Sequence, residues 1–216
     1  LYLIIGVKMK KLSLLLFMII VFFTSANLSF SVCPPGWDSY NYTYSYPYGD
    51  DECDITVYYC YTTLPSGTFV VRVDMIQVEI PCGFQVVGLE DFWEDFYNRL
   101  GDTAIYYGGT FPPCDDVHSP IKYMEIRKAF CWKLHNLGGN TGLGRIVDCG
   151  YTGQCIWNYK LCTNYNYTPP KNEKIPLGRT AISGENCSST PPVVPPQGYG
   201  WGDEWWTECY IISCYE

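Results

Sequence analysis

The stretch ECDITVYYCYTT, residues 52–63, alternates β-branched and aromatic side chains with polar ones. This composition and this two-residue period are typical of a β-strand with one buried face. The turn sequence LPSG follows at residues 64–67, and TFVVRVDMIQVEIPCG, residues 68–83, is again strand-like. Two strand-like runs around a turn that contains Pro and Gly predict a β-hairpin.

The turn also predicts which residues of this hairpin lie opposite each other. If Thr63 lies opposite Thr68, then Cys53 lies opposite Val78, and Cys82 comes just past the open end. A Cys53–Cys82 disulfide that closes the hairpin is one pairing that this register allows.

The two cysteines of the first strand, Cys53 and Cys60, are seven positions apart. In a strand, this odd separation places their side chains on opposite faces and their Cα atoms about 23 Å apart, at ~3.3 Å per residue. In a helix the Cα atoms would lie roughly 10 Å apart along the axis. A disulfide needs Cα atoms within about 7 Å, so the two cysteines cannot bond to each other. They also cannot share one zinc ion or form a CxxC redox centre, so each is expected to bond to a different partner.

A near-copy of this motif, QCIWNYKLCTN, occurs at residues 154–164. Each copy is preceded by a cysteine beside a turn and is followed by another cysteine further along the chain. We interpret residues 33–82 and 149–187 as two divergent copies of one cysteine-pinned strand motif, and ECYIISC, residues 208–214, as a shorter third. The competing interpretation is that so many cysteines produce similar spacings by chance.

The segment MKKLSLLLFMIIVFFTSANLSFS, residues 9–31, has the layout of a secretory signal peptide, with lysines, an apolar run and then small residues. The apolar run, Leu12–Phe23, is short for a membrane anchor, which takes about 20 helical residues. We expect cleavage after Ala26 or Ser31, with residues 1–8 an upstream extension of the reading frame. The mature protein is then secreted or located at the cell surface, with no membrane span.

The mature chain is predicted to be strongly acidic. Residues 1–31 contain three lysines and no acid, so 11 of the 14 basic side chains and all 22 acidic ones remain, a net charge of −11. Such a surface repels nucleic acid and anionic membranes, so neither is a predicted partner.

All twelve cysteines lie in the mature part of the chain. An even number in an exported protein predicts a disulfide framework. Zinc binding is the competing interpretation, but the short paired spacings of zinc sites are missing. We therefore expect no metal and no cofactor. The disulfide candidates are Cys33, Cys53, Cys60, Cys82, Cys114, Cys131, Cys149, Cys155, Cys162, Cys187, Cys209 and Cys214.

The predicted fold class is mainly β (α+β): an antiparallel sheet of hairpins with one amphipathic helix, stapled by disulfides. Tyrosine, tryptophan and β-branched residues favour strands because they fit a pleated, half-buried surface. A second hairpin is expected from IKYMEIRKAFCWKL, residues 121–134, through the Gly-rich residues 137–144 into RIVDCG. On the apolar side of the first run, only Lys128 is out of place.

The one helix is predicted at residues 89–100, within GLEDFWEDFYNRLG. Acidic residues occupy its first turns, Arg99 its last turn, and Gly101 follows as a stop. Its apolar residues recur at helical spacing and are expected to pack on the sheet. They are Leu89, Phe92, Trp93, Phe96, Tyr97 and Leu100.

The chain is predicted to contain four segments. Residues 1–31 are the upstream extension and signal peptide, and residues 32–187 form a cysteine-rich β domain. Residues 188–202, SSTPPVVPPQGYGWG, are a Pro-rich linker. Residues 203–216 are a tail with its own pair of cysteines, and the even total predicts that this tail is bonded back to the body.

No catalytic signature is found. The two histidines, His118 and His135, lie in no recognisable motif, and the G-x-S-x-G, HExxH and EF-hand patterns are missing. We predict no catalytic residue and no enzyme. An extracellular hydrolase stays a third hypothesis, because any pair among 22 acids can supply the two carboxylates of a glycosidase.

Three tryptophans, Trp201, Trp205 and Trp206, stand in the polar, Gly-rich sequence GYGWGDEWWTEC. Exposed tryptophans offer anchors to a partner protein or flat faces to sugar rings. The competing interpretation is that they pack on the main domain and dock the tail. We predict a structural or adhesive protein outside the cell or on its surface. The alternative is a glycan- or protein-binding module that uses these aromatics, with an extracellular protein or polysaccharide as partner.

Overall fold

The computed structural model describes residues 33–107, 111–116, 120–139, 141–150, 153–182, 187–212 and 214. The expected signal peptide and His118 lie outside these residues. The helices and strands are β1 (Asp38–Tyr48), β2 (Asp51–Thr63), β3 (Phe69–Glu79), α2 (Cys82–Val86), α3 (Glu90–Tyr107), β4 (Lys122–Ala129), β5 (Cys131–Leu137), β6 (Leu143–Asp148), β7 (Gln154–Asn164), β8 (Lys171–Ile182), β9 (Glu204–Trp206) and β10 (Tyr210–Ile211).

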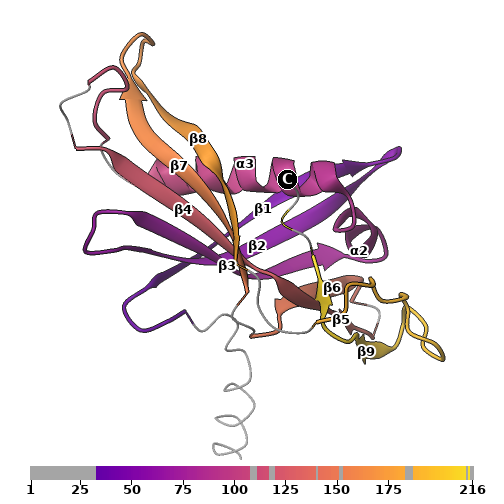
Figure 1. Ribbon diagram of the computed structural model, residues 1–216. Helices are drawn as coiled ribbons and strands as arrows, with labels where there is room; N and C mark the ends of the chain where they lie inside the picture. The colour runs from indigo at the N-terminus through magenta and orange to yellow at the C-terminus, as the bar shows by residue number, and fades with distance from the viewer. Residues whose placement is uncertain are drawn as a thin grey trace, which may run out of the picture. The chain divides into compact units, whose positions relative to one another are not determined.

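The strands of the described residues form one mostly antiparallel sheet that branches at β3 (Figure 1). One edge of β3 pairs with β2, which in turn pairs with β1. Its other edge is shared, because Phe69–Arg72 pairs in parallel with β4 while Met75–Glu79 pairs with β6. One branch continues from β4 to β7 and β8, and the other from β6 to β5, β9 and β10. The predicted mainly β class is confirmed.

The first predicted hairpin is confirmed, since β2 and β3 pair on either side of residues 64–67, but its predicted register is wrong. Thr63 lies opposite Phe69, and a β-bulge at Tyr58 and Tyr59 places Ile55 opposite Val78. Thr68 belongs to the turn, where its carbonyl accepts a hydrogen bond from the Leu64 amide. A bulge adds one unpaired residue to a strand, so a register counted from the turn shifts beyond it.

The second predicted hairpin is also confirmed, with β5 and β6 antiparallel. The run predicted as its first strand, residues 121–134, is divided at Phe130 into β4 and β5, and only β5 pairs with β6. Lys128 lies on the buried side of β4 and is fully buried, although it is the residue that breaks the apolar pattern. The side chain of Lys128 thus points to the same face of β4 as the apolar residues, as the two-residue alternation of the sequence predicted.

The predicted amphipathic helix at about residues 89–100 is confirmed as α3, with two differences. A second, short helix, α2, follows the first hairpin, and α3 runs to Tyr107. Gly101 lies inside α3 and does not end it. The Lys174 side chain of β8 lies against it, 3.0 Å from where a Cβ would stand. A side chain at this position would crowd Lys174, and the glycine leaves room for that contact. Leu89 precedes α3 and is exposed.

The core lies between α3 and the sheet, and aromatic rings dominate it. The other predicted apolar residues of α3 are all buried. Phe92 meets Tyr46 of β1 with ring centroids 5.2 Å apart, and Tyr97 stacks on Trp157 of β7 at 3.5 Å. Large aromatic side chains bury about 150–250 Å² each. The helix therefore joins the β1 side of the sheet to the β7–β8 branch.

All twelve cysteines are paired, as predicted. The bonds are Cys33–Cys60, Cys53–Cys82, Cys114–Cys162, Cys131–Cys187, Cys149–Cys209 and Cys155–Cys214. The hairpin-closing bridge is therefore present, both C-x6-C motifs bond to separate partners, and the tail is bonded back to the body. The two proposed copies of the motif, residues 33–82 and 149–187, nevertheless have different disulfide connections. Cys53 bonds to Cys82 within its own copy, whereas Cys155 bonds to Cys214 in the tail. The connectivity gives the repeat interpretation no support.

Residues 188–202, predicted as a linker, contain no helix or strand. Val194 and Trp201 nevertheless pack against the core. The Asn136 side chain of β5 donates hydrogen bonds to the carbonyls of Trp201 and Asp203, both at 2.9 Å. The Pro-rich segment is thus fastened to the sheet.

Candidate functional site

The three tryptophans singled out in the sequence do not share one exposed surface. β9 pairs with β5, and successive residues of a strand face opposite sides. Trp205 is buried, packs against Phe84 and Trp201, and donates a hydrogen bond from Nε1 to the Gly200 carbonyl at 3.1 Å. Trp206 faces the other way and is 47% exposed. Of the three, it presents the most accessible ring.

The Trp206 ring is held from the side of β5. It stacks on the imidazole of His135, with centroids 3.6 Å apart and planes 10° apart, and Lys133 Nζ lies 4.6 Å from its centroid. His135 Nε2 lies 3.1 Å from a carboxylate oxygen of Glu204. Burial lowers the pKa of His135 and outweighs the opposing effect of Glu204. At neutral pH the tryptophan therefore rests on an uncharged ring.

Trp206 forms part of a groove of about 480 Å³ between the Pro-rich segment and the tail. Glu208 is the one charged residue in its lining. Pro192 and Pro196 stand in the wall, and each fixes its own φ and lacks an N–H donor. The lining residues are Ser188, Thr190, Pro192, Val193, Pro196, Gln197, Trp206, Thr207, Glu208, Cys209 and Tyr210.

Covalent and backbone links hold the two walls of this groove together. The Ser188 amide donates to the Cys209 carbonyl at 3.2 Å, and the Ile211 amide donates to the Ser188 carbonyl at 2.8 Å. The bonds Cys131–Cys187 and Cys149–Cys209 tie both walls to the sheet branch of β5 and β6. The groove is therefore preformed.

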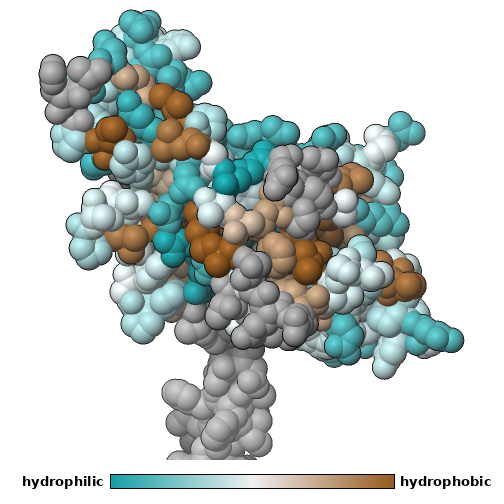
Figure 2. All heavy atoms as spheres, viewed as in Figure 1, coloured by the Kyte–Doolittle hydropathy of each residue, from teal (hydrophilic) through white to brown (hydrophobic). Residues whose placement is uncertain are grey.

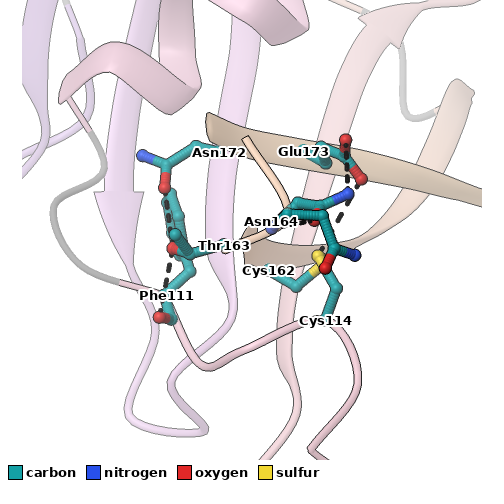
Figure 3. The surroundings of a disulfide bond; sticks show 8 residues. Phe111, Cys114, Cys162, Thr163, Asn164, Asn172 and Glu173 are labelled. Carbon is teal, nitrogen blue, oxygen red and sulfur yellow. Dashed lines mark hydrogen bonds between the residues drawn. A yellow bond between two sulfur atoms is a disulfide. The ribbon is translucent and has the colours of Figure 1, made fainter. Parts of the chain in front are cut away.

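One cluster in the described part of the chain has the residue types of a metal site: Cys114, Cys162 and Glu173 (Figure 3). The two cysteines are bonded to each other, so neither offers the thiolate that zinc needs. The Glu173 carboxylate accepts a hydrogen bond from the Asn164 side chain at 3.1 Å. The cluster acts as a staple between the loop at residues 111–116 and β7.

Hydrophobic side chains are also exposed at the outer end of the β4–β7–β8 branch (Figure 2). Ile121, Ile175 and Leu177 are each more than one-third exposed. They lie among charged residues of the same strands, such as Lys160 and Lys174.

The sequence did not reveal that the Pro-rich segment forms a wall of the groove, because a Pro-rich segment has the same composition whether it is a free linker or packs on the fold.

In the described part of the chain, no helix has both the length and the apolar character needed to cross a membrane. Comparison of the whole chain with protein-family models, with curated proteins and with solved structures gives no match.

Proposed function

We propose that the protein is an extracellular or cell-surface adhesive protein without catalytic activity, and that the Trp206 groove is where it contacts a partner protein. The observation that carries this proposal is the groove itself: a half-exposed tryptophan in a nearly uncharged, preformed cleft. Tryptophan is enriched among the side chains that contribute most to binding at protein interfaces, where it becomes buried on association.

The complete pairing of the cysteines supports a place outside the cell. Disulfides persist in oxidising compartments and are reduced in the cytosol. Six of them also suit a protein that must keep its shape without help from the cell.

The lining of the groove favours a protein over a polysaccharide. Pro192, Val193, Pro196, Trp206 and Tyr210 supply most of its large side chains, and Val193 is 81% exposed. Such walls match an apolar side chain of a partner, whereas a sugar needs many hydrogen bonds. The preformed shape lowers the entropy that binding would otherwise cost.

The experiment measures binding of the purified mature protein to cells of the producing organism by flow cytometry. Trp206→Ala should lose binding, while Tyr199→Ala should keep it, because Tyr199 is also about half exposed but does not line the groove. Both variants should unfold at nearly the wild-type urea concentration.

Treating the cells with a protease should remove the binding, and treating them with glycosidases should not. Retention by the Trp206→Ala variant would refute the groove as the contact surface. Loss of binding after glycosidase treatment alone would identify a polysaccharide partner and contradict the proposal.

A further inference from the structure

The strand β1 forms one edge of the sheet. It pairs with β2 over its whole length, Asp38–Tyr48, without a bulge, and no other described strand pairs with it. Residues 41–46 take part in no described backbone hydrogen bond besides those of this pairing. The N–H and C=O groups on the outer side of such a strand are positioned to pair with another strand.

The β1 edge lacks the features by which natural sheets prevent pairing between edges. These features are charged side chains, especially lysine, together with proline and β-bulges. From Ser39 to Tyr46 the strand contains no charged residue and no proline, and Asp38 and Pro47 stand outside this stretch. Most of the length of β1 is therefore an uninterrupted, uncharged edge.

The strand β8, at the edge of the other branch, shows the contrast. It contains Lys174, Pro176 and Arg179, and a bulge interrupts its pairing with β7. Proline removes a donor from the edge, and a bulge twists the edge away from a partner. The same sheet thus protects one of its edges and leaves β1 open.

The sequence of β1 is nearly the same when it is read in either direction. In YNYTYSY, residues 40–46, tyrosines alternate with small polar residues around the central Thr43. If Thr43 lies opposite Thr43 of a second copy in an antiparallel pair, then Tyr42 lies opposite Tyr44 and Asn41 opposite Ser45. Opposite residues of such a pair share one face, so tyrosine meets tyrosine and polar meets polar. This self-complementarity is what a two-fold interface requires.

The two faces of β1 suit this pairing. On one face, Tyr42 stacks on Tyr44 with ring centroids 5.8 Å apart, and the guanidinium of Arg99 from α3 lies 4.9 Å from the centre of the Tyr44 ring. On the other face, the side chains of Asn41, Thr43 and Ser45 are exposed. A second copy would extend the row of tyrosines, and aromatic pairs across strands are stabilising.

We propose that β1 pairs with β1 of a second copy of this chain, antiparallel and with Thr43 on the two-fold axis, so that the two sheets join into one. No residue of β1 lines the Trp206 groove, so this contact goes beyond the proposed function and does not depend on it. One pair of strands is a small interface, and small interfaces are typical of reversible association. Each copy is acidic, with a net charge of −8, so salt should strengthen the dimer by screening repulsion between the copies.

The test is sedimentation velocity of the full mature protein over a range of concentrations from about 5 to about 500 µM, which covers weak association. The wild-type protein should change from monomer to dimer as the concentration rises. Trp206→Ala should dimerise as the wild type does, because the groove takes no part in the contact.

A pair of double variants tests the register. Asn41→Asp with Ser45→Lys places opposite charges across the axis twice in each dimer and should strengthen dimerisation about tenfold. Asn41→Lys with Ser45→Lys places like charges there and should weaken it about tenfold. The second variant also lowers the net negative charge of each copy, so an effect of net charge alone would have the opposite sign.

Thr56→Lys is the control for the distance from the edge, with Thr43→Lys as its counterpart. The hydroxyls of Thr43 and Thr56 lie 2.8 Å apart, so both variants lose the same hydrogen bond and gain the same charge. Only Thr43→Lys brings two ammonium groups together at the axis and should weaken the dimer. Thr56 lies on β2, one strand further from the axis, so its variant should dimerise nearly as the wild type does.

Three results would overturn the proposal. The first is a monomer at every concentration. The second is a dimer of equal strength in the wild type and in both double variants, which would place the contact elsewhere. The third is weakening by both double variants, which would exclude the register centred on Thr43.

Discussion

The fully buried lysine of β4 makes stability depend on pH in a direction that can be measured. Lys128 Nζ lies 4.0 Å from the centroid of the Trp93 ring of α3 and donates a hydrogen bond to the Ile212 carbonyl at 3.2 Å. Burial lowers its pKa well below the usual 10.5. The folded protein therefore binds the proton of Lys128 more weakly than the unfolded chain does.

The sign follows from proton linkage. Below the folded-state pKa, both states are protonated and the full cost of burying the charge is present. As pH rises above that pKa towards 10.5, the unfolded chain binds more protons, so the free energy of unfolding increases. The slope for one proton is at most about 1.4 kcal/mol per pH unit.

Lys128→Met keeps a long side chain of similar shape and removes the titrating group. The assay is urea unfolding, followed by tryptophan fluorescence without reductant, at pH steps from neutral to 10.5. The unfolding free energy of wild type minus that of Lys128→Met should increase with pH at up to about 1.4 kcal/mol per pH unit. Tyrosine titration is common to both proteins and cancels in the difference.

Lys128→Ala separates the effect of size from that of charge. It leaves a cavity at a fully buried position and should cost about 2–5 kcal/mol relative to the Met variant, with the same pH dependence as that variant. If the wild-type and Met curves stay parallel over the whole range, the lysine has an ordinary proton affinity and the reasoning is refuted.

Two further predictions concern the tail and the groove. Replacing Cys155 and Cys214 together by serine should lower the unfolding free energy by about 3 kcal/mol. The loss is no larger because Cys149–Cys209 still closes the long loop, so the removed bond restrains a ring of only about 12 residues. An unchanged urea midpoint would contradict this. Trp205→Ala should cost about 3–5 kcal/mol of unfolding free energy because the Trp205 side chain is buried, whereas Trp206→Ala should cost much less because Trp206 is half exposed. Equal shifts of the urea midpoint in the two variants would contradict the assigned faces of β9.

The mainly β class, both hairpins and the apolar face of α3 follow from local patterns. Alternation with period two and apolar spacing near 3.6 depend on which side of an element is buried, and both are visible in a short stretch of sequence. The pairing of all cysteines and the attachment of the tail follow from an even number and from distance limits within a strand. These limits show that Cys53 and Cys60 have separate partners without identifying both of them.

The length of α3 and the register of the first hairpin do not follow from local patterns. Glycine commonly ends a helix, but Gly101 lies inside α3, where its missing side chain leaves room for the side chain of Lys174 from β8, a residue distant in the sequence. The bulge at Tyr58 shifts every pair beyond it, and no residue type marks its place. Local sequence patterns therefore predicted the helix and the hairpin correctly, but the end of the helix and the register of the hairpin differ from those that local patterns predict.

The sequence by itself determined that this chain builds a sheet, pairs its cysteines and fastens its tail, because these depend on side-chain period, number and reach. Only the tertiary structure decided which cysteines meet, that Trp205 is buried while Trp206 lines a groove, and that Tyr97, Tyr159, Glu94 and Arg179 surround one cavity. The physical reason is that the cavity joins α3 to β7 and β8, which are far apart in the chain. The groove lies within residues 188–210, but disulfides to Cys131 and Cys149 and the pairing of β9 with β5 hold its walls in place. No local pattern contains these contacts between distant segments.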